Sequence, residues 1–441
     1  MQLSISGPAR SWQGAVAVPG DKSISHRALI FGALAEGTSH VHNFLHAGVT
    51  EAMIDCVRAL GVAVEVSPNG DLTIKGGHWR PPAAPLDCRG SGATMRLLLG
   101  ALAGRLNGSD LAATLTGSPG LLRRPMGRVA DPLRQMGAQI EGSAGANQPP
   151  LRVRSTKLHG IDYTLPVASA QVKTALLIAA LSAEGPTTLH EPGPSRDHTE
   201  RMLSALGMEL ATWSTSVTLT PAASPLPAFS LDVPGDFSSA AFPLIAALIV
   251  PGSQVMLHSV GINPTRTGLL DALAEMGAAV AVTGERDSGG EPVGDLGARS
   301  RGLRGCNIHG DRVVRMIDEF PIFAVAATQA EGETVVRDAA ELRLKESDRI
   351  ASLVGELQKM GARIEARPDG FRIEGPTRLR GAHVDSYGDH RLAMALAVAG
   401  LVAEGETMVS GAECIGESFP NFVELMQALE TNLDFGLLIA D

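Results

Sequence analysis

The strongest constraint on the fold of this chain is a pattern that recurs six times along its 441 residues. In each copy an apolar segment ends at a small residue and a glycine, and a short stretch rich in Thr and Val usually follows. Successive glycines are separated by 67 to 80 residues, and they stand at Gly37, Gly108, Gly185, Gly252, Gly332 and Gly405. The pattern is typical of a buried helix that ends at a glycine C-cap and leads into a strand.

A second series of glycines alternates with the first and follows amphipathic segments. In DHTERMLSALG, for example, apolar Met202, Leu203 and Leu206 recur at helical spacing. The glycines of this series are Gly61, Gly137, Gly207, Gly277 and Gly361, and the sixth copy, SFPNFVELMQALETN, lacks one. We therefore expect six α/β units, each with a buried helix, a strand, an amphipathic helix and further strands. Because the first helix of each unit is apolar all round, a compact bundle is favoured over a solenoid.

Composition excludes several classes of partner. A net charge of −10 and a pI near 5.7 argue against nucleic acid or an anionic membrane as the main partner. The four cysteines and the histidines show no metal-ligand spacing, so we expect no metal and no disulfide framework. The N-terminus lacks the features of a secretory signal, and the longest apolar run is too short to span a bilayer. A cytoplasmic protein is the expectation.

The six apolar helices all begin with polar residues. Their first residues read GDKSISHR (20–27), GSGATMR (90–96), ASAQVK (168–173), GDFSSA (235–240), IDEFP (317–321) and GDHR (388–391). One interpretation of the first is a solvated turn with Asp21 as the N-cap. If the helices pack in parallel within each half, however, their N-termini converge, and free N–H groups and helix dipoles favour an anion there. We therefore predict an electropositive cleft in an otherwise acidic protein.

The amphipathic helices add cations at their starts. These are Arg123 and Arg124, Arg196, Arg266, and the pair Lys345 and Arg349. The spacing of Lys345 and Arg349 predicts that they share one helical face, where an anion between them would relieve their repulsion. A solvated surface charge pattern is the alternative. No nucleotide-binding glycine loop of the GxxxxGK[ST] or GxGxxG type is present.

In its more specific motifs the chain resembles the EPSP synthases over essentially its whole length. The matching segments are PGDKSISHRA, SGATMRLLLG, RRPMGRV, PVASAQVKTALL, SRDHTERML, GDFSSAAF, INPTRTG, DEFPIFAVAA, LRLKESDRI, YGDHRLAMA and SFPNF. The resemblance implies transfer of an enolpyruvyl group from phosphoenolpyruvate to shikimate 3-phosphate, without a cofactor. It also implies an inside-out α/β barrel fold of two domains with three βαβαββ units each. Pro-Gly pairs at 19–20 and 234–235 suggest domains 20–234 and 1–19 plus 235–441.

The resemblance also implies roles for individual residues. Those matching the shikimate 3-phosphate site are Lys22, Ser23, Arg27, Ser169, Ala170, Gln171, Arg196, Asp318 and Lys345. Those matching the phosphoenolpyruvate site are Lys22, Gly92, Arg124, Gln171, Glu346, Arg349 and Arg391. Guanidinium groups suit both substrates because they bind carboxylate and phosphate bidentately.

The reaction itself needs two proton-transfer groups. We assign Asp318 as the base towards the 5-hydroxyl of shikimate 3-phosphate and Glu346 as the acid/base at the methylene carbon of phosphoenolpyruvate. Lys22 is the alternative proton carrier. The reaction would proceed through a tetrahedral ketal phosphate.

Some positions depart from the family pattern. Gly90 stands where many members have Asn, and Glu417 stands where some members have Lys. These two departures put two contacts on the phosphoenolpyruvate side in doubt. GDKS, SAQVK, RDHTE and NPTR resemble the class II subgroup, which is often tolerant to glyphosate, although Gly92 keeps the small residue that admits this inhibitor. We expect a monomer.

Two rival functions remain. The UDP-N-acetylglucosamine enolpyruvyltransferases share the fold and donor, but typically carry Lys-Asn where Lys22-Ser23 stands here, and often a Cys in the loop that reads TGSPGLLRRP. A non-catalytic anion-binding repeat protein would gain nothing from Asp318 and Glu346 among so many cations. The segment 285–302, rich in Gly and charge, is predicted to be a mobile hairpin or loop without an assigned function.

Overall fold

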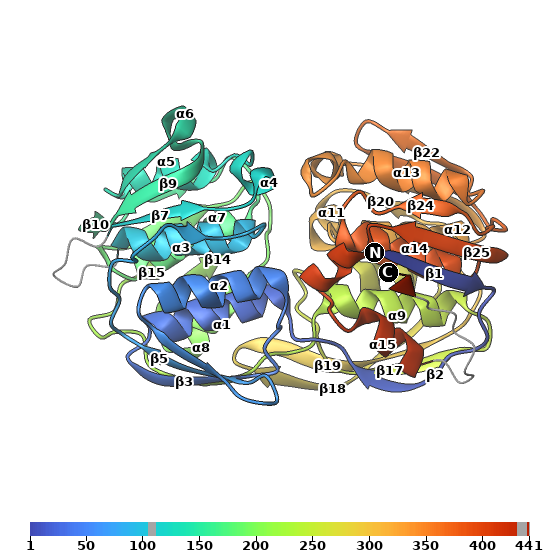
Figure 1. The fold of residues 1–441 in the computed structure, drawn as a ribbon, viewed down its shortest axis with the longest axis horizontal. Helices are drawn as coiled ribbons and strands as arrows, with labels where there is room; N and C mark the ends of the chain where they lie inside the picture. Colours follow the sequence, from blue (N-terminus) through green and yellow to red (C-terminus); the bar gives the residue numbers. More distant parts are fainter. Residues whose placement is uncertain (105–111, 430–438, 441) are drawn as a thin grey trace. The chain divides into compact units, whose positions relative to one another are not determined.

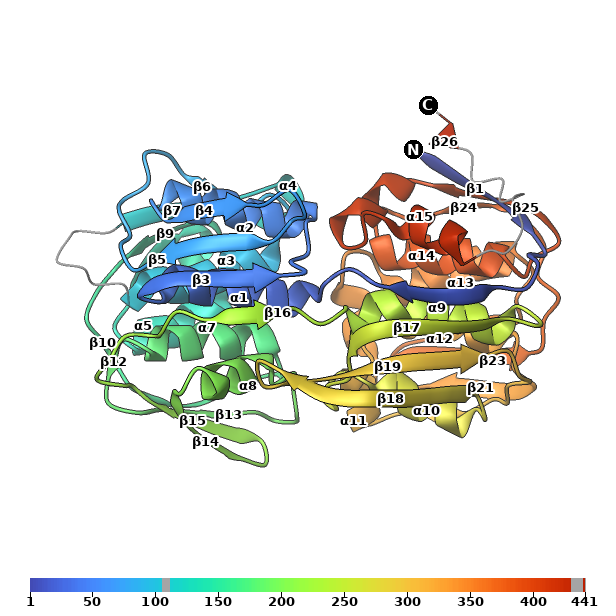
Figure 2. The ribbon, with the colours of Figure 1, turned by 90° about the horizontal axis from the view of Figure 1, so that it is seen from below.

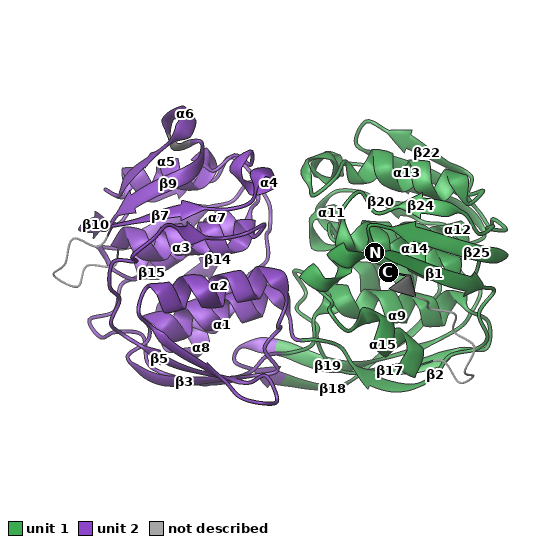
Figure 3. Cartoon of the chain, viewed as in Figure 1, with its two compact units in different colours: residues 1–19, 234–286, 292–441 green, residues 20–233, 287–291 purple. Residues whose placement is uncertain are grey.

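The computed structural model describes residues 1–104, 112–429 and 439–440. The chain divides into two compact units (Figures 1 and 3). Unit 1 comprises residues 1–19, 234–286 and 292–441, and unit 2 comprises residues 20–233 and 287–291. Among the described residues, no helix is long and apolar enough to span a membrane.

Unit 2 contains three four-stranded sheets with the orders β16-β3-β5-β4, β6-β7-β9-β8 and β11-β13-β15-β14. In each sheet the first two strands are parallel and the others antiparallel. Its strands are β3 (Gly37–His42), β4 (Ala63–Val66), β5 (Leu72–Gly76), β6 (Leu86–Asp87), β7 (Ala112–Thr116), β8 (Gln139–Gly142), β9 (Gln148–Arg154), β11 (Asp162–Thr164), β13 (Thr187–His190), β14 (Glu209–Trp213), β15 (Ser216–Thr220) and β16 (Ser230–Asp232), with β10 (Leu158–His159) and β12 (Ala183–Glu184) pairing separately. Its helices are α1 (Lys22–Leu34), α2 (Gly48–Ala59), α3 (Gly92–Gly104), α4 (Pro119–Leu122), α5 (Gly127–Gln135), α6 (Ser143–Ala146), α7 (Ala170–Ala180) and α8 (His198–Ala205).

Unit 1 repeats this plan with the sheets β18-β19-β17-β2, β20-β21-β23-β22 and β24-β25-β1-β26. Figure 2 shows the first of them as adjacent arrows. The strands are β1 (Gln2–Gly7), β2 (Gln13–Ala17), β17 (Gln254–Gly261), β18 (Ala279–Ser288), β19 (Glu291–Arg299), β20 (Asn307–Ile308), β21 (Gly332–Val336), β22 (Ile364–Arg367), β23 (Gly370–Gly375), β24 (His383–Asp385), β25 (Gly405–Ser410) and β26 (Ile439–Ala440). The helices are α9 (Phe237–Ile249), α10 (Gly268–Glu275), α11 (Asp311–Arg315), α12 (Phe320–Thr328), α13 (Arg349–Lys359), α14 (His390–Gly400) and α15 (Phe422–Ala428), with the 3₁₀ helices η1 (Ala340–Leu344) and η2 (Ala412–Glu417).

The six sheets correspond to the six predicted repeats. In β6-α3-β7-α5-β8-β9 and in β20-α12-β21-α13-β22-β23 the order βαβαββ can be read along the chain, with short helices inserted between some of the elements. Two repeats exchange their first strand: β2 precedes α1 in sequence but pairs with β17, whereas β16 precedes α9 but pairs with β3. The predicted α/β fold with six βαβαββ units is therefore confirmed.

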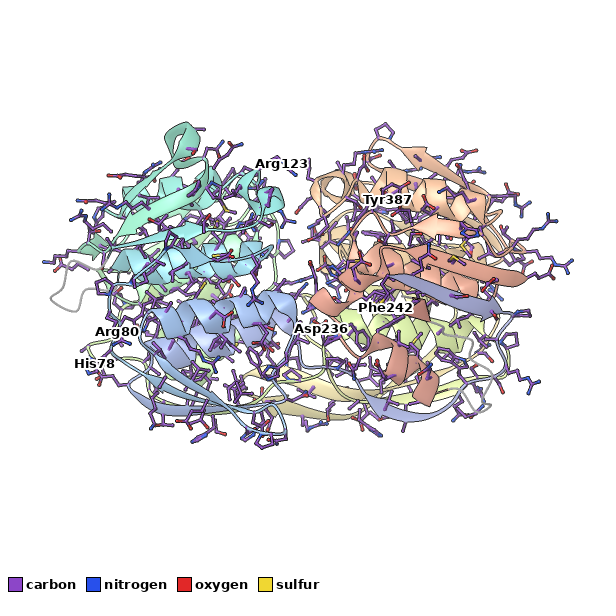
Figure 4. The ribbon with its side chains drawn as sticks, viewed as in Figure 1. His78, Arg80, Arg123, Asp236, Phe242 and Tyr387 are labelled. Carbon is purple, nitrogen blue, oxygen red and sulfur yellow. The ribbon has the colours of Figure 1, made fainter. Side chains whose placement is uncertain are left out.

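The predicted buried helices are α1, α3 and α7 in unit 2, and α9, α12 and α14 in unit 1. Nearly every residue of α9, α12 and α14 is buried, and Phe242 lies in the core of unit 1 (Figure 4). All-round burial explains why these segments lack a polar stripe. Each unit has its own continuous hydrophobic core around its helices.

Only the second glycine series stands at helix ends, where Gly61, Gly137, Gly207, Gly277 and Gly361 each directly follow a C-cap residue. For the described glycines of the first series the C-cap prediction is wrong, because these glycines lie two to four residues beyond the C-cap, and Gly37, Gly332 and Gly405 are the first residues of strands. The φ angle is positive at ten of the eleven glycines that define the repeat: Gly37, Gly61, Gly137, Gly185, Gly207, Gly252, Gly277, Gly332, Gly361 and Gly405. The eleventh, Gly108, lies outside the described residues. Because side chains other than glycine are strained at such angles, the repeat is visible in the sequence as a period of glycine.

Candidate active site

In unit 2 the first two turns of α1, α3 and α7 meet through side-chain contacts. Arg27 on α1 donates from Nη2 to Thr174 Oγ1 on α7 at 2.6 Å. Arg96 on α3 donates to Gln171 Oε1 on α7. Ser91 Oγ, just before α3, lies 3.5 Å from His26 Nε2 on α1. The three N-termini therefore lie at one end of the bundle, as the sequence predicted.

The start of α1 is organised by its cap. Asp21 accepts hydrogen bonds from the backbone N–H groups of Ser23 at 2.7 Å and Ile24 at 2.9 Å. The cap holds the first turn rigidly, so Lys22 and Ser23, both partly exposed, start from a defined backbone. Asp21 is therefore the N-cap, as the solvated-turn interpretation expected. That interpretation does not explain the polar side chains of Lys22 and Ser23.

Arg27 is almost completely buried, with 4% of its surface exposed. Its Nε donates to Thr199 Oγ1 at 2.8 Å and its Nη1 to the Ser23 carbonyl at 2.9 Å, in addition to the bond to Thr174. Burial lowers the pKa of Arg27 to about 10, against the opposing charge of Glu200. The guanidinium group is still a cation at neutral pH, and its orientation is set by α1, α7 and α8.

The first two turns of α1 also contain two residues with local structural contacts. His26 Nδ1 donates to the Lys22 carbonyl at 2.7 Å, which requires the neutral ring to carry its proton on that nitrogen. Burial lowers the pKa of His26 to about 4. Ser25 Oγ accepts from the Leu45 N–H at 3.1 Å. These contacts support the interpretation that Ser25 and His26 have structural roles.

A second cluster of polar groups surrounds Gly92 at the start of α3. A Cβ atom at Gly92 would lie 2.8 Å from Arg96 Nη1 and 3.4 Å from Arg124 Nη1, so both guanidinium groups approach this backbone closely. Arg96 was not singled out from the sequence, although the motif SGATMR contains it. Its bond to Gln171 connects the predicted residues of α3 to those of α7.

The predicted residues of α7 lie at its start. Ser169 is the N-cap residue, and the Ala170 carbonyl accepts from Thr174 Oγ1 at 2.6 Å. Arg196 lies close enough to Arg27 for its positive charge to oppose the protonation of Arg27. Ser169, Ala170, Gln171 and Arg196 are all partly exposed, so they remain accessible to a ligand.

In unit 1 the buried Arg349 connects three carboxylates. Its Nε lies 2.7 Å from Asp389 Oδ2, its Nη2 lies 2.8 Å from Glu346 Oε2, and its Nη1 lies 3.5 Å from Asp318 Oδ1. Burial would lower the pKa of Arg349, but the negative charges of Asp389 and Glu346 outweigh it and raise the pKa. The two proposed acid/base residues, Asp318 and Glu346, therefore share one cationic partner.

Arg391 is the second cation of this group. Its Nη2 lies 3.5 Å from Asp318 Oδ2, and its Nη1 donates to the Asp318 carbonyl at 3.3 Å. Asp389, which is completely buried, caps α14 by accepting from the Arg391 N–H at 3.0 Å. Asp389 was not assigned a role from the sequence, yet it contacts both Arg349 and the backbone of Arg391.

The prediction that Lys345 and Arg349 share a helical face is wrong. Lys345 follows η1 in an extended conformation, whereas Arg349 is the first residue of α13. The helix begins there because Asp348 caps it, accepting from the Ala351 N–H at 3.0 Å. Lys345 Nζ instead donates to Glu341 Oε1 at 3.0 Å.

The start of α9 in unit 1 resembles the start of α1 in its chemistry. Asp236, labelled in Figure 4, caps the helix and accepts from the Ser238 N–H at 2.7 Å. The buried Arg266 donates to Asp236 Oδ1 at 2.9 Å and to Ser238 Oγ at 2.7 Å. Ser238 in turn donates to Glu319, which directly precedes α12. The polar starts of the three buried helices of unit 1 are thus in mutual contact as well.

Each unit therefore presents cations and helix N-termini at one end of its helix triplet, and unit 1 adds Asp318 and Glu346. Among the described residues, no group of His, Cys, Asp and Glu could hold a metal ion. The model of the family described as EPSP synthase (3-phosphoshikimate 1-carboxyvinyltransferase) matches residues 7–426. The chain belongs to the EPSP synthase family.

Individual relatives agree with this assignment. A 3-phosphoshikimate 1-carboxyvinyltransferase of Desulforudis audaxviator is 51% identical over 433 residues, which cover 97% of this chain and 99% of the relative. The enzyme of that name from Gloeobacter violaceus is 52% identical over 420 residues, or 95% and 96% of the two chains. The structure of EPSP synthase from Acinetobacter baumannii has a TM-score of 0.89 at 43% identity and covers 97% of this chain and 98% of its own. EPSP synthases are transferases of the shikimate pathway that use phosphoenolpyruvate and shikimate 3-phosphate.

Proposed function

We propose that this chain transfers the enolpyruvyl group of phosphoenolpyruvate to the 5-hydroxyl of shikimate 3-phosphate and releases phosphate. The match of the family model to residues 7–426 is the observation that carries the proposal. The side chains fit it, because two multiply anionic substrates require buried, oriented guanidinium groups, and Arg27, Arg349 and Arg391 are each at most 5% exposed.

Unit 2 would supply most of the contacts to shikimate 3-phosphate. Lys22, Ser23 and Arg27 of α1 and Ser169, Ala170 and Gln171 of α7 would bind it, with Arg196 beside Arg27. A phosphate fits here because helix N-termini and a guanidinium group all favour a dianion. From unit 1, Lys345 would contact the hydroxyl side of the ring, where its bond to Glu341 orients the ammonium group.

Gly92, Arg124, Arg349 and Arg391 would bind phosphoenolpyruvate, with Lys22, Gln171 and Glu346. Arg349 has the strongest structural support, because it is buried and its orientation is set by Asp389 on one side and Glu346 on the other. A ligand carboxylate or phosphate would compete with Asp318, which lies 3.5 Å from the guanidinium groups of both Arg349 and Arg391.

Asp318 would then act as the base towards the 5-hydroxyl. Glu346 would donate a proton to the methylene carbon as the tetrahedral ketal phosphate forms, and later remove one as phosphate leaves. Lys22 is the alternative for this second role. General acid–base groups of this kind each contribute about 10²–10⁴-fold to the rate.

The experiment is an assay of phosphate release from phosphoenolpyruvate by the purified protein. Release should require shikimate 3-phosphate, and Asp318→Ala and Glu346→Gln should each lower kcat by about 10²–10⁴-fold. UDP-N-acetylglucosamine is the control acceptor, and turnover with it alone would instead support the UDP-N-acetylglucosamine enolpyruvyltransferase function. If neither shikimate 3-phosphate nor UDP-N-acetylglucosamine supports phosphate release, both functions are contradicted.

Glyphosate tolerance, a monomeric state and a cytoplasmic location also belong to this proposal. The class II-like motifs support tolerance, whereas Gly92 keeps the small residue that admits glyphosate. Half-inhibition at low micromolar glyphosate in the same assay would count against tolerance. Sedimentation of the protein with and without both substrates would test the monomeric state.

A further inference from the structure

The segment 285–302, to which no function was assigned, contains the end of β18, a turn and the whole of β19, which form a β-hairpin. Strand β18 ends at Ser288, β19 begins at Glu291, and Gly289 and Gly290 make a two-residue turn with positive φ angles of 59° and 86°. Such a turn matches the right-handed twist of a hairpin. Although β18 and β19 lie in a sheet of unit 1, residues 287–291 belong to unit 2 (Figure 3).

The tip of this hairpin is closely packed against other residues of unit 2. A Cβ atom at Gly290 would lie 2.7 Å from the Arg201 carbonyl oxygen on α8. Arg201 Nη1 donates to the Gly290 carbonyl at 3.4 Å, and Ser288 Oγ donates to the Asp232 carbonyl at 2.7 Å. The backbone of the tip therefore has a defined position against α8 and the end of β16.

Glu291 places a buried carboxylate at this contact. Only 1% of its surface is exposed, and its Oε1 lies 2.8 Å from Nδ1 of His198, which is also 1% exposed. Burying a carboxylate is costly unless it is hydrogen-bonded or paired, so the bond to His198 helps to stabilise Glu291 in this position. His198 is the first residue of α8.

Three successive residues of α8 make three different buried contacts. His198 binds Glu291, Thr199 accepts from Arg27 Nε at 2.8 Å, and Glu200 lies 2.6 Å from the buried Lys173 Nζ. Thr199 also shares a 2.6 Å hydrogen bond with Thr174, the other hydroxyl that holds Arg27. The first turn of α8 thus connects the hairpin tip to the guanidinium group.

The direction of these hydrogen bonds follows from the number of protons available. Thr174 donates its one hydroxyl proton to the Ala170 carbonyl, so Thr199 must donate to Thr174 and accept from Arg27. Three of the five N–H donors of Arg27 are used by these partners and the Ser23 carbonyl. Because Thr199 on α8 accepts from Arg27 Nε, a small shift of α8 would rotate the guanidinium group and reorient the two N–H donors of Arg27 that remain for a ligand.

We propose that Glu291 is a positioning residue for shikimate 3-phosphate: through His198 it holds the first turn of α8, whose Thr199 orients Arg27. This inference rests on the proposed role of Arg27 in binding that substrate. It assigns the hairpin tip, residues 287–291, a role in acceptor affinity, not in the chemical step.

The test compares Glu291→Ala and Glu291→Gln with Asp287→Asn, a control that removes a charge from the exposed part of the same tip. Affinity for shikimate 3-phosphate alone is measured by calorimetry, and KM for each substrate and kcat by phosphate release. Glu291→Ala should weaken shikimate 3-phosphate binding by about three- to tenfold, with KM for phosphoenolpyruvate and kcat unchanged. Glu291→Gln, which keeps the hydrogen-bonding oxygen, should lose less.

Equal affinity in Glu291→Ala and Asp287→Asn would overturn the inference, as would a loss that affects both substrates alike. If Glu291→Ala does not fold, Thr199→Val provides the test, because it removes the acceptor of Arg27 Nε directly. Wild-type affinity in Thr199→Val would also overturn the inference. The variant Arg27→Ala distinguishes failure of this inference from failure of the proposed function. If Arg27→Ala binds shikimate 3-phosphate normally, the role of Arg27 in the proposed function is wrong, whatever the result for Glu291.

Discussion

Gly92 illustrates how the smallest residue can determine a binding site. Arg96 Nη1 occupies the space that a side chain would need, at 2.8 Å from an added Cβ atom, and Arg124 Nη1 lies next to it at 3.4 Å. The substitution Gly92→Ala should displace Arg96, bring a methyl group against Arg124, and raise KM for phosphoenolpyruvate by about tenfold, a loss near 1.4 kcal/mol. Gly90→Ala is the matched control, because a Cβ atom there would have nothing within 4 Å. Equal KM values for the two variants would contradict this prediction.

His26 should make the protein sensitive to mild acid. Its pKa is about 4 in the folded protein because burial lowers it from 6.5. Between these values the unfolded chain binds a proton that the folded protein does not, so stability is lost as pH falls from about 6.5 to 4. The loss from this group amounts to roughly 3 kcal/mol at the acid end.

Urea unfolding at pH 7.5, 6 and 5 measures this loss. The variant His26→Gln should show a shallower fall in the free energy of unfolding over the same range, even if it is less stable at pH 7.5. Parallel pH profiles for the two proteins would exclude His26 as the cause.

At the scale of elements, α7 and α8 are joined by a buried group of charges. Lys173 Nζ lies 2.6 Å from both Glu191 Oε2 and Glu200 Oε1, and all three side chains are at most 9% exposed. Burial lowers the pKa of Lys173, but the two carboxylates outweigh it and the net shift is upward. Burial raises the pKa of Glu200, against the effect of Lys173.

Replacing Lys173 with Met should therefore destabilise the protein by about 3–5 kcal/mol at pH 8, because two carboxylates are left buried without their cation. The deficit should shrink as pH falls towards 5, since protonation of the carboxylates then restores neutrality. The matched control is Lys173→Met/Glu191→Gln/Glu200→Gln, which should recover much of the loss. Denaturant unfolding at both pH values checks this, and a deficit independent of pH would contradict it.

At the scale of the whole molecule, residues assigned to the shikimate 3-phosphate site and residues assigned to the phosphoenolpyruvate site should differ in one respect. Only substitutions in the first set should abolish the stabilisation of the folded protein by shikimate 3-phosphate. A ligand present at 100 times its Kd stabilises a folded protein by about 2.7 kcal/mol. Shikimate 3-phosphate alone should raise the melting temperature of the wild type and of Glu346→Gln, but not that of Arg27→Ala at the same concentration. Loss of the shift in Glu346→Gln as well would show that the carboxylate is needed for acceptor binding.

Much of the fold could be predicted because the physical causes of its elements are local. Glycines with positive φ directly follow the amphipathic helices, as Gly61 and Gly207 do, and all-round apolar segments such as 237–249 mark the buried helices. The start of α13 differs from the prediction because a helix cap is not visible in the spacing of charges. The carboxylate of Asp348 caps α13, so the helix begins at Arg349 and Lys345 lies outside it.

The order and spacing of the motifs determined the family, the sixfold repeat and the candidate residues, because these depend on residue type at defined positions along the chain. Only the tertiary structure decided that Asp389, Glu346 and Asp318 share Arg349, that Thr174 and Thr199 hold Arg27, and that Glu291 is buried against His198. These contacts join residues as many as 172 positions apart. Nothing in the local pattern can indicate which distant group will satisfy a buried charge, because that choice is made by packing.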